Sequence, residues 1–191
     1  MSVSMIRERT VFVLSGKRKS GKDFVAEKLQ NAIGGHICGL VRLSGPLKQQ
    51  YAQEHGLDFQ GLLSSGPYKE IYRDDMIKWG ETRRNRDPGY FCRLATHDVE
   101  IFPVWIVTDA RRKTDVEYFK KNFSKVILVR VEASDEVRSE RGWSFAPGID
   151  DVESECGLDA GIDWDHIIIN NNEVGDLDNF EKRIHLLLSL T

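Results

Sequence analysis

The sequence predicts an α/β domain in which five parallel strands form a doubly wound sheet. Short runs of β-branched and apolar residues alternate with longer segments whose apolar residues recur at helical spacing. A glycine-rich turn separates the first strand from the first helix. The chain has 191 residues, of which 40% are hydrophobic and 30% are charged. This composition is typical of one packed domain with a well-solvated surface.

The first half of the chain contains two expected strands and two expected helices. Residues 11–14 are short, apolar and β-branched, as in a buried strand. The range 23–33 has apolar residues at helical spacing and ends at a glycine pair, which favours a helix end. Residues 37–43 form the second strand. The range 67–86 begins with a proline that can open a helix, and its apolar side is formed by Tyr68, Ile71, Tyr72 and Trp79.

The second half continues the alternation. Strands are expected at 104–108, 126–131 and 167–169, and helices at 113–122, in a short charged segment ending at Arg141, and at 176–190. Strands separated by helices favour a parallel sheet. Right-handed crossovers then bring the carboxyl ends of the strands to one edge, where a ligand is expected.

Charge and cysteine content exclude several classes of protein. The net charge is −3, with 27 Lys and Arg against 30 Asp and Glu, which argues against a nucleic-acid partner. No apolar run approaches the ~20 residues of a membrane span. Three widely spaced cysteines and the absence of a secretory signal or a C-terminal Ser-Lys-Leu predict a cytoplasmic protein. We expect small-molecule substrates and a monomer, with no nucleic acid and no membrane as partners.

The strongest motif runs from Gly16 to Lys22 and has the pattern glycine, four residues, glycine, lysine. Between a strand and a helix, this pattern is typical of a phosphate-binding loop, because glycines let backbone N–H groups surround an anion. Lys22 can then reach the β- and γ-phosphates of a nucleotide. The next residue is Asp23, where the common motif has the Ser or Thr that binds magnesium. A basic surface turn is the alternative.

Basic residues elsewhere predict a site for a second anion. Lys69, Arg73 and Arg84 share one face of the 67–86 helix, which points to a cleft, although a solvated face has the same pattern. Asp109 ends the third strand, and Arg111-Arg112 follow it. That aspartate is placed as in a Walker B motif, or the segment is an ordinary strand-end turn. Lys48 follows the second strand, in a segment that is equally explained as a turn.

The chain after the fourth strand predicts a lid. Arg138 and Arg141 lie three residues apart, and Gly142 follows as a possible hinge. Arginines in a last helical turn also complement the helix dipole, which is a sufficient structural reason for them. Asn170, Asn171 and Asn172 follow the fifth strand, where amides could contact a ligand or form a turn. The GTPase sequence Asn-Lys-x-Asp and the dinucleotide fingerprint are missing.

Taken together, these segments resemble the animal-type, P-loop phosphomevalonate kinases. The resemblance is carried by Leu14–Asp23, Arg42–Lys48, Tyr51–Leu57, Asp87–Arg93, Arg141–Trp143 and Glu153–Asp159. It implies one domain over 1–191 with the fold of nucleoside monophosphate kinases. Within it, a helical substrate-binding region is expected at about 44–98 and a lid at about 132–145. The implied reaction transfers the γ-phosphoryl group of ATP to (R)-5-phosphomevalonate, giving 5-diphosphomevalonate for isoprenoid and sterol synthesis, with Mg²⁺.

The resemblance also implies roles for individual residues. Contacts with ATP fall to Gly16, Lys17, Arg18, Lys19, Ser20, Gly21, Lys22, Asp23, Arg141 and Asn171. The phosphate acceptor would contact Lys48, Lys69, Arg73, Arg84, Arg93, Arg111, Arg112 and Asn170. The catalytic set is Lys19, Lys22, Asp23, Arg111, Arg138 and Arg141, with Asp23 holding Mg²⁺ through water. Two features depart from the family: a peroxisome-like C-terminal tripeptide is missing, and Asn171 stands where a histidine can occur.

Two alternatives remain open at this level. A nucleoside or nucleotide kinase of the same fold would need base recognition around residues 84–93. A non-catalytic ATP-binding switch would bind the nucleotide without turnover. ADP release measured with phosphomevalonate, with nucleoside monophosphates or with no acceptor separates the three functions.

Overall fold

The computed structural model describes residues 7–64, 66–171, 182, 185, 186 and 189. Its centre is a five-stranded sheet with the order β2-β3-β1-β4-β5. The strands are β1 (Arg7–Ser15), β2 (Cys38–Val41), β3 (Val104–Val107), β4 (Phe123–Glu132) and β5 (His166–Ile169). Every neighbouring pair is parallel. The expected α/β fold with five parallel strands is confirmed.

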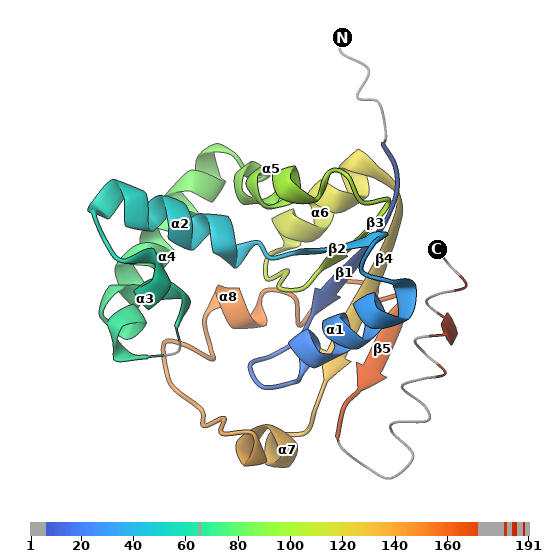
Figure 1. Ribbon diagram of the computed structural model, residues 1–191. Coiled ribbons are helices and arrows are strands. Elements are labelled where there is room, and N and C mark those ends of the chain that lie inside the picture. Colours follow the sequence, from blue (N-terminus) through green and yellow to red (C-terminus); the bar gives the residue numbers. More distant parts are fainter. Residues whose placement is uncertain (1–6, 65, 172–181, 183–184, 187–188, 190–191) are drawn as a thin grey trace.

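Helices cover both faces of the sheet, as Figure 1 shows. The helix α1 (Lys22–Ile33) packs Val25 and Leu29 against one face. The helix α6 (Lys113–Asn122) packs Val116 and Phe119 against the other. Each helix follows one strand and leads toward the next, as right-handed crossovers require. The predicted ranges of these two helices agree with the structure to within one residue.

A group of four helices joins β2 to β3: α2 (Ser44–His55), α3 (Phe59–Leu63), α4 (Pro67–Arg86) and α5 (Tyr90–Thr96), followed by the 3₁₀ turn η1 (His97–Val99). Three of them share a small core around Tyr51, Leu62 and Met76. The segment considered as a turn at Lys48 is therefore part of a helix. One predicted core contact is wrong, because Ile71 has 74% of its surface exposed.

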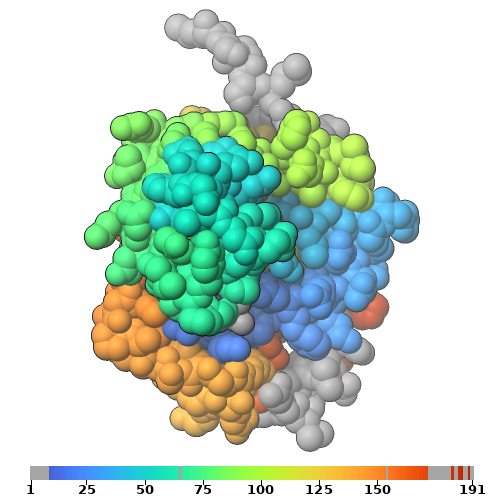
Figure 2. Space-filling model, turned by 60° about the vertical axis from the view of Figure 1, so that its left-hand side comes forward, coloured from blue at the N-terminus to red at the C-terminus, as the bar shows by residue number. Residues whose placement is uncertain are grey.

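The chain after β4 forms two short helices, α7 (Asp135–Glu140) and α8 (Glu153–Cys156), before β5. In Figure 2, the blue atoms of the N-terminal part lie mainly to the right of the teal helical group, and a few of them lie between that group and the orange segment around α7 and α8. Asn172 and most of the helix expected at 176–190 lie outside the described residues, which include only 182, 185, 186 and 189 of that range. Among the described helices, none combines the length and apolar character that a membrane crossing needs.

Candidate active site

The P-loop, residues 16–21, connects the carboxyl end of β1 to the first turn of α1. A Cβ atom on Gly16 would lie 2.4 Å from the carbonyl oxygen of Val131, so the close approach of β4 requires glycine there. Gly21 has φ 86° and Lys19 has φ 62°. Glycine adopts such values freely, whereas a lysine in this region is uncommon. The loop therefore has the tight backbone that the motif predicts.

Lys22 and Asp23 occupy the first two positions of α1. Burial lowers the pKa of Lys22, and the positive charge of Arg111 lowers it further, against the opposing effect of Asp23 and Asp109. A desolvated ammonium group gains stability from a bound anion. The Asp23 carboxylate is exposed beside it. Mg²⁺ needs only one or two protein carboxylates when phosphates and water complete its coordination, so the donor set fits a magnesium–nucleotide complex.

Both arginines of the expected lid contact the main chain of the P-loop. Arg138 Nε donates a hydrogen bond to the carbonyl oxygen of Arg18 over 2.9 Å, and its guanidinium lies 3.8 Å from the ring centroid of Trp143. Arg141 Nη1 donates to the carbonyl oxygens of Lys19 and Ser20, both over 3.2 Å. Arg138 is only 6% exposed. The segment after β4 is thus closed onto the loop in this structure.

The two asparagines after β5 differ in position. Asn170 Nδ2 donates to the carbonyl oxygen of Ser20 over 2.9 Å, and Asn170 packs so closely on Gly21 that a Cβ there would lie 2.1 Å from Nδ2. Asn171 Oδ1 accepts from the N–H of Ser134, which caps α7. Asn170 therefore contacts the P-loop, and it is not among the residues that line the basic cavity described next.

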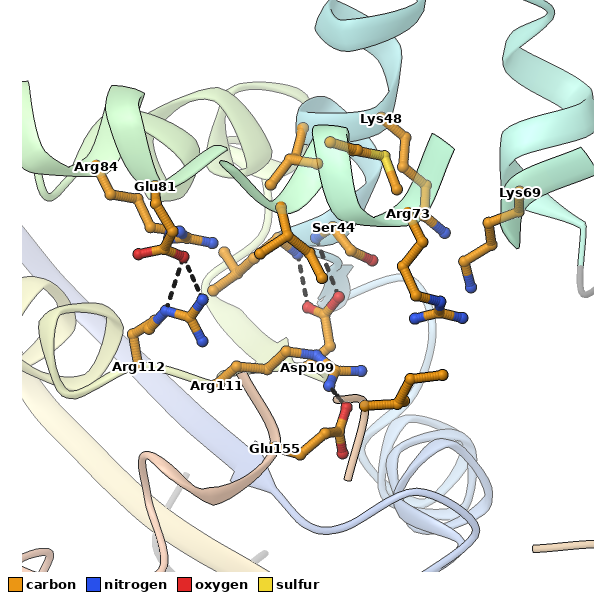
Figure 3. Close-up of a pocket in the computed structure, with 15 residues that line it drawn as sticks. Ser44, Lys48, Lys69, Arg73, Glu81, Arg84, Asp109, Arg111, Arg112 and Glu155 are labelled. Atoms are coloured by element: carbon orange, nitrogen blue, oxygen red, sulfur yellow. Dashed lines mark hydrogen bonds and ion pairs between the residues drawn. The ribbon is translucent and has the colours of Figure 1, made fainter. Parts of the chain in front are cut away.

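The basic residues from three parts of the chain line one cavity of ≈ 160 Å³. Lys48 comes from α2, the residues Lys69, Arg73 and Arg84 come from α4, and Arg111 and Arg112 follow β3. In Figure 3, Asp109 and Arg111 lie between Arg84 and Arg112 on one side and the two lysines on the other. Apolar contacts are supplied by Leu43, Leu47, Met76, Ile77 and Ile149. The predicted cationic cleft exists.

The two lysines of this pocket make no ion pair among the described residues, although Asp109 lies near Lys48 and Glu70 near Lys69. Burial, together with the positive charges of Lys48 and Arg73, lowers the pKa of Lys69 to about 8. Burial also lowers the pKa of Lys48. Both pKa values are lowered, as expected for buried cations without a bound anion.

The arginines of the pocket are instead held by acidic residues. Arg84 pairs with Asp115 over 3.0 Å, and Arg73 pairs with Glu70 over 2.5 Å. Two further pairs join Arg111 to Glu155 and Arg112 to Glu81. Sequence reasoning did not assign these acids to the site, because three of the four pairs join residues more than 30 positions apart. Two of the acids had a local signal: Glu70 lies three residues before Arg73 on α4, and Asp115 is the third residue after Arg112.

Other predicted residues lie outside the pocket. Arg93 is an exposed residue that pairs with Asp87 and does not line the cavity. In the P-loop, Lys17 pairs with Asp159 over 2.5 Å and Arg18 pairs with Asp150 over 3.0 Å. The acidic last third of the chain thus neutralises part of the loop.

Asp109 holds the junction between β2 and α2. Its Oδ1 accepts from the N–H of Leu43 over 2.6 Å, and Oδ2 accepts from the N–H of Ser44 over 3.0 Å. These bonds fix the first turn of the helix that carries Lys48. Asp109 is only 9% exposed, and both of its carboxylate oxygens accept from the backbone at this junction.

Comparison with known proteins agrees with this arrangement. The family model described as phosphomevalonate kinase matches residues 14–125, a range that contains the P-loop and the whole helical group. The chain belongs to the phosphomevalonate kinase family. A phosphomevalonate kinase of Drosophila melanogaster is 43% identical over 183 residues, which cover 93% of this chain and 94% of the fly protein.

Solved structures show the same fold. A crystal structure of a Thermus thermophilus protein superposes with a TM-score of 0.53 at 17% identity, covering 97% of this chain and 100% of that one. The shikimate kinase of Acinetobacter baumannii, solved in complex with shikimate, superposes with a TM-score of 0.51 at 13% identity and covers 95% of this chain and 94% of its own. These superpositions show that the α/β fold of this chain is shared with a shikimate kinase.

Proposed function

We propose that this chain transfers the γ-phosphoryl group of ATP to (R)-5-phosphomevalonate, giving 5-diphosphomevalonate and ADP. The observation that carries the proposal is the cavity lined by six cationic side chains. Its Arg111 is near enough to Lys22 of the P-loop to lower the pKa of that lysine. A cationic cavity of this kind suits an acceptor that carries both a phosphate and a carboxylate. Membership of the phosphomevalonate kinase family supports the same acceptor.

The chemistry demands positioning and charge neutralisation more than covalent help. Two phosphate-bearing anions repel each other, so cations must hold them in line. We assign Lys22, Lys19 and the pair Arg138 and Arg141 to the nucleotide phosphates, with the rest of the P-loop and Asn171 completing the ATP site. The lysines Lys48 and Lys69, with Arg73, Arg84, Arg111 and Arg112, are assigned to the acceptor. We assign Arg111 to both anions, because it lines the cavity and is also near enough to Lys22 of the P-loop to lower the pKa of that lysine.

Mg²⁺ is proposed to arrive with ATP and to be held by Asp23 through its bound water. The cation would neutralise charge on the β- and γ-phosphates when bound. The exposed Asp23 carboxylate at the start of α1 suits a cation that gives up its water reluctantly.

We further propose a cytosolic monomer made of one domain, with the lid at about 132–145 and the acceptor region at about 44–98. Cys38, Cys92 and Cys156 are free thiols, which suits a reducing compartment. Cell fractionation and the elution volume of the purified protein test location and oligomeric state.

The test of the proposed reaction is a coupled assay of ADP release with three acceptor conditions. With ATP present in every assay, we expect ADP release only when phosphomevalonate is the acceptor. Equal or faster release with nucleoside monophosphates would instead assign the chain as a nucleotide kinase. Nucleotide binding without release under any condition would identify a non-catalytic ATP-binding switch.

A further inference from the structure

We propose that Asp115 is a positioning residue that arranges the arginine side of the acceptor pocket. The inference rests on the proposed function, because it assigns this residue an effect on acceptor binding. Asp115 does not line the cavity, and its carboxylate is expected to act through Arg84, Arg111 and Arg112.

The Asp115 carboxylate contacts the side chain of Arg84 and the backbone of Arg111 and Arg112. Its Oδ1 accepts from Arg84 Nη1 over 3.0 Å. Its Oδ2 accepts from the backbone N–H groups of Arg111 and Arg112, each over 3.0 Å. The thiol of Cys92 is a further neighbour, 3.9 Å from Oδ1. One side chain from the first turn of α6 therefore joins α4 to the loop that follows β3.

Burial gives these contacts their strength. Asp115 is 1% exposed, and the side chain of Arg84 is 12% exposed. A buried carboxylate is stable only when it is paired and hydrogen-bonded, and its charge offsets repulsion among the three neighbouring guanidinium groups. Removing that charge would leave Arg84 without its carboxylate partner, and the ring of Phe91, 4.9 Å from the guanidinium, would be the contact that still orients it.

The backbone bonds determine how the two consecutive arginines diverge. Arg111 turns toward Glu155, and Arg112 turns toward Glu81. Arg112 Nη1 is buried and has no hydrogen-bond partner in the described structure. A buried donor in a pocket wall is costly unless a ligand satisfies it. We therefore expect an oxygen of the acceptor anion to accept a hydrogen bond from Arg112 Nη1, with the guanidinium oriented by Asp115 and Glu81.

A purely structural role is the competing explanation, because Asp115 also stabilises the start of α6. The two roles differ in what they change. Loss of a helix-start bond lowers the melting temperature, whereas misplaced arginines raise the KM for the acceptor. The KM for ATP should change much less, because the guanidinium of Arg111, the pocket residue that we assign to both anions, pairs with Glu155 and not with Asp115.

The experiment compares Asp115→Asn with Asp58→Asn. Asp58, an exposed residue, is the control for loss of a helix-start carboxylate, because it accepts from the N–H groups of Gln60 and Gly61 at the start of α3, outside the pocket. Asp115→Asn should raise the KM for phosphomevalonate at least ten-fold and change the KM for ATP less than two-fold. Asp58→Asn should leave both values within two-fold of the wild type.

A second variant, Asp115→Ser, serves if the asparagine variant does not fold. Serine can still accept from the backbone at a helix start but cannot pair with Arg84, so the same selective rise is expected. An unchanged acceptor KM in a folded variant, or a parallel rise for ATP, would overturn the assignment. Failure of the proposed function is separate, because the wild type would then show no turnover with phosphomevalonate.

Discussion

The guanidinium of Arg141 donates a hydrogen bond to the carbonyl oxygen of Lys19 over 3.2 Å. Lys19 is the P-loop residue with φ 62°, and Arg141 comes from the segment that follows α7. The bond therefore ties the loop expected to hold phosphates to the expected lid, at a point where the backbone adopts an uncommon conformation.

Arg141→Ala should lower kcat by about 10²-fold, the effect of removing one preorganised charge-stabilising donor. The KM for the acceptor should change much less, because Arg141 does not line the acceptor pocket. Steady-state kinetics with each substrate varied would measure both effects. Arg86→Ala, at an exposed position near the end of α4, is the control. A variant that raised only the acceptor KM would show that Arg141 belongs to the other ligand.

Lys22→Met should lower turnover by about 10²–10³-fold, on the same physical grounds. Lys22 begins α1, and methionine has a similar length and good helix propensity. The melting temperature should therefore stay close to that of the wild type. Circular dichroism and the coupled assay test this pair of expectations. Near-normal turnover in the folded variant would end the interpretation of residues 16–22 as a P-loop.

Arg84→Ala should mainly raise the KM for phosphomevalonate and spare ATP binding. It should also lower the melting temperature, since the buried carboxylate of Asp115 loses its cation. Arg83→Ala is a matched control on the same helix, because Arg83 pairs with Glu54 away from the pocket. If the two variants had equal acceptor KM values, Arg84 would have no part in acceptor binding.

The activity should depend on the charge of Lys69. The pKa of Lys69 is about 8, so this side chain is cationic below that pH and increasingly neutral above it. The acceptor phosphate is a dianion above its second pKa of about 6. The attraction between Lys69 and this phosphate is therefore lost as the pH rises. We expect kcat/KM for the acceptor to fall as pH rises through about 8, whereas kcat/KM for ATP should not follow.

Lys69→Arg separates this cause from others, because a guanidinium stays protonated across the range. Its acceptor kcat/KM should not decline near pH 8. Lys78→Arg, at an exposed position of α4, should keep the wild-type profile. The same decline in all three proteins would exclude Lys69 as the titrating group.

Asp23→Asn tests the magnesium role. The variant keeps the shape and hydrogen bonding of the residue but loses its charge, so it should need more Mg²⁺ for half-maximal rate and should lose kcat. An acidic residue at a helix start contributes only about 0.3–1 kcal/mol of stability, so the melting temperature should change little. A drop in stability with an unchanged Mg²⁺ dependence would make Asp23 a helix-start residue only.

Local pattern was enough to predict most of the fold. The strands are short apolar runs, and α1, α4 and α6 have apolar residues at helical spacing with clear start or stop signals. The P-loop was predictable for the same reason, because its spacing and its place between a strand and a helix are both properties of consecutive residues.

The helix that carries Lys48 was not predictable in this way. Its first turn depends on Asp109, which is more than 60 positions further along the chain. The failure at Ile71 has a related cause: α4 turns Met76 and Gly80 toward its neighbours, and Ile71 lies outside that contact.

The amino-acid sequence by itself determined the succession of strands and helices along the chain, the P-loop and the presence of many cations. Periodicity and motif spacing suffice for the strands, the helices and the P-loop, because both depend on near neighbours along the chain. Only the tertiary structure decided which cations share a pocket and which of them carry a counter-charge. Lys48 and Lys69 lie in the pocket without an ion pair among the described residues, whereas Arg93 lies outside it, paired with Asp87. Coulomb interactions and desolvation depend on distance in space and on burial, and packing sets both.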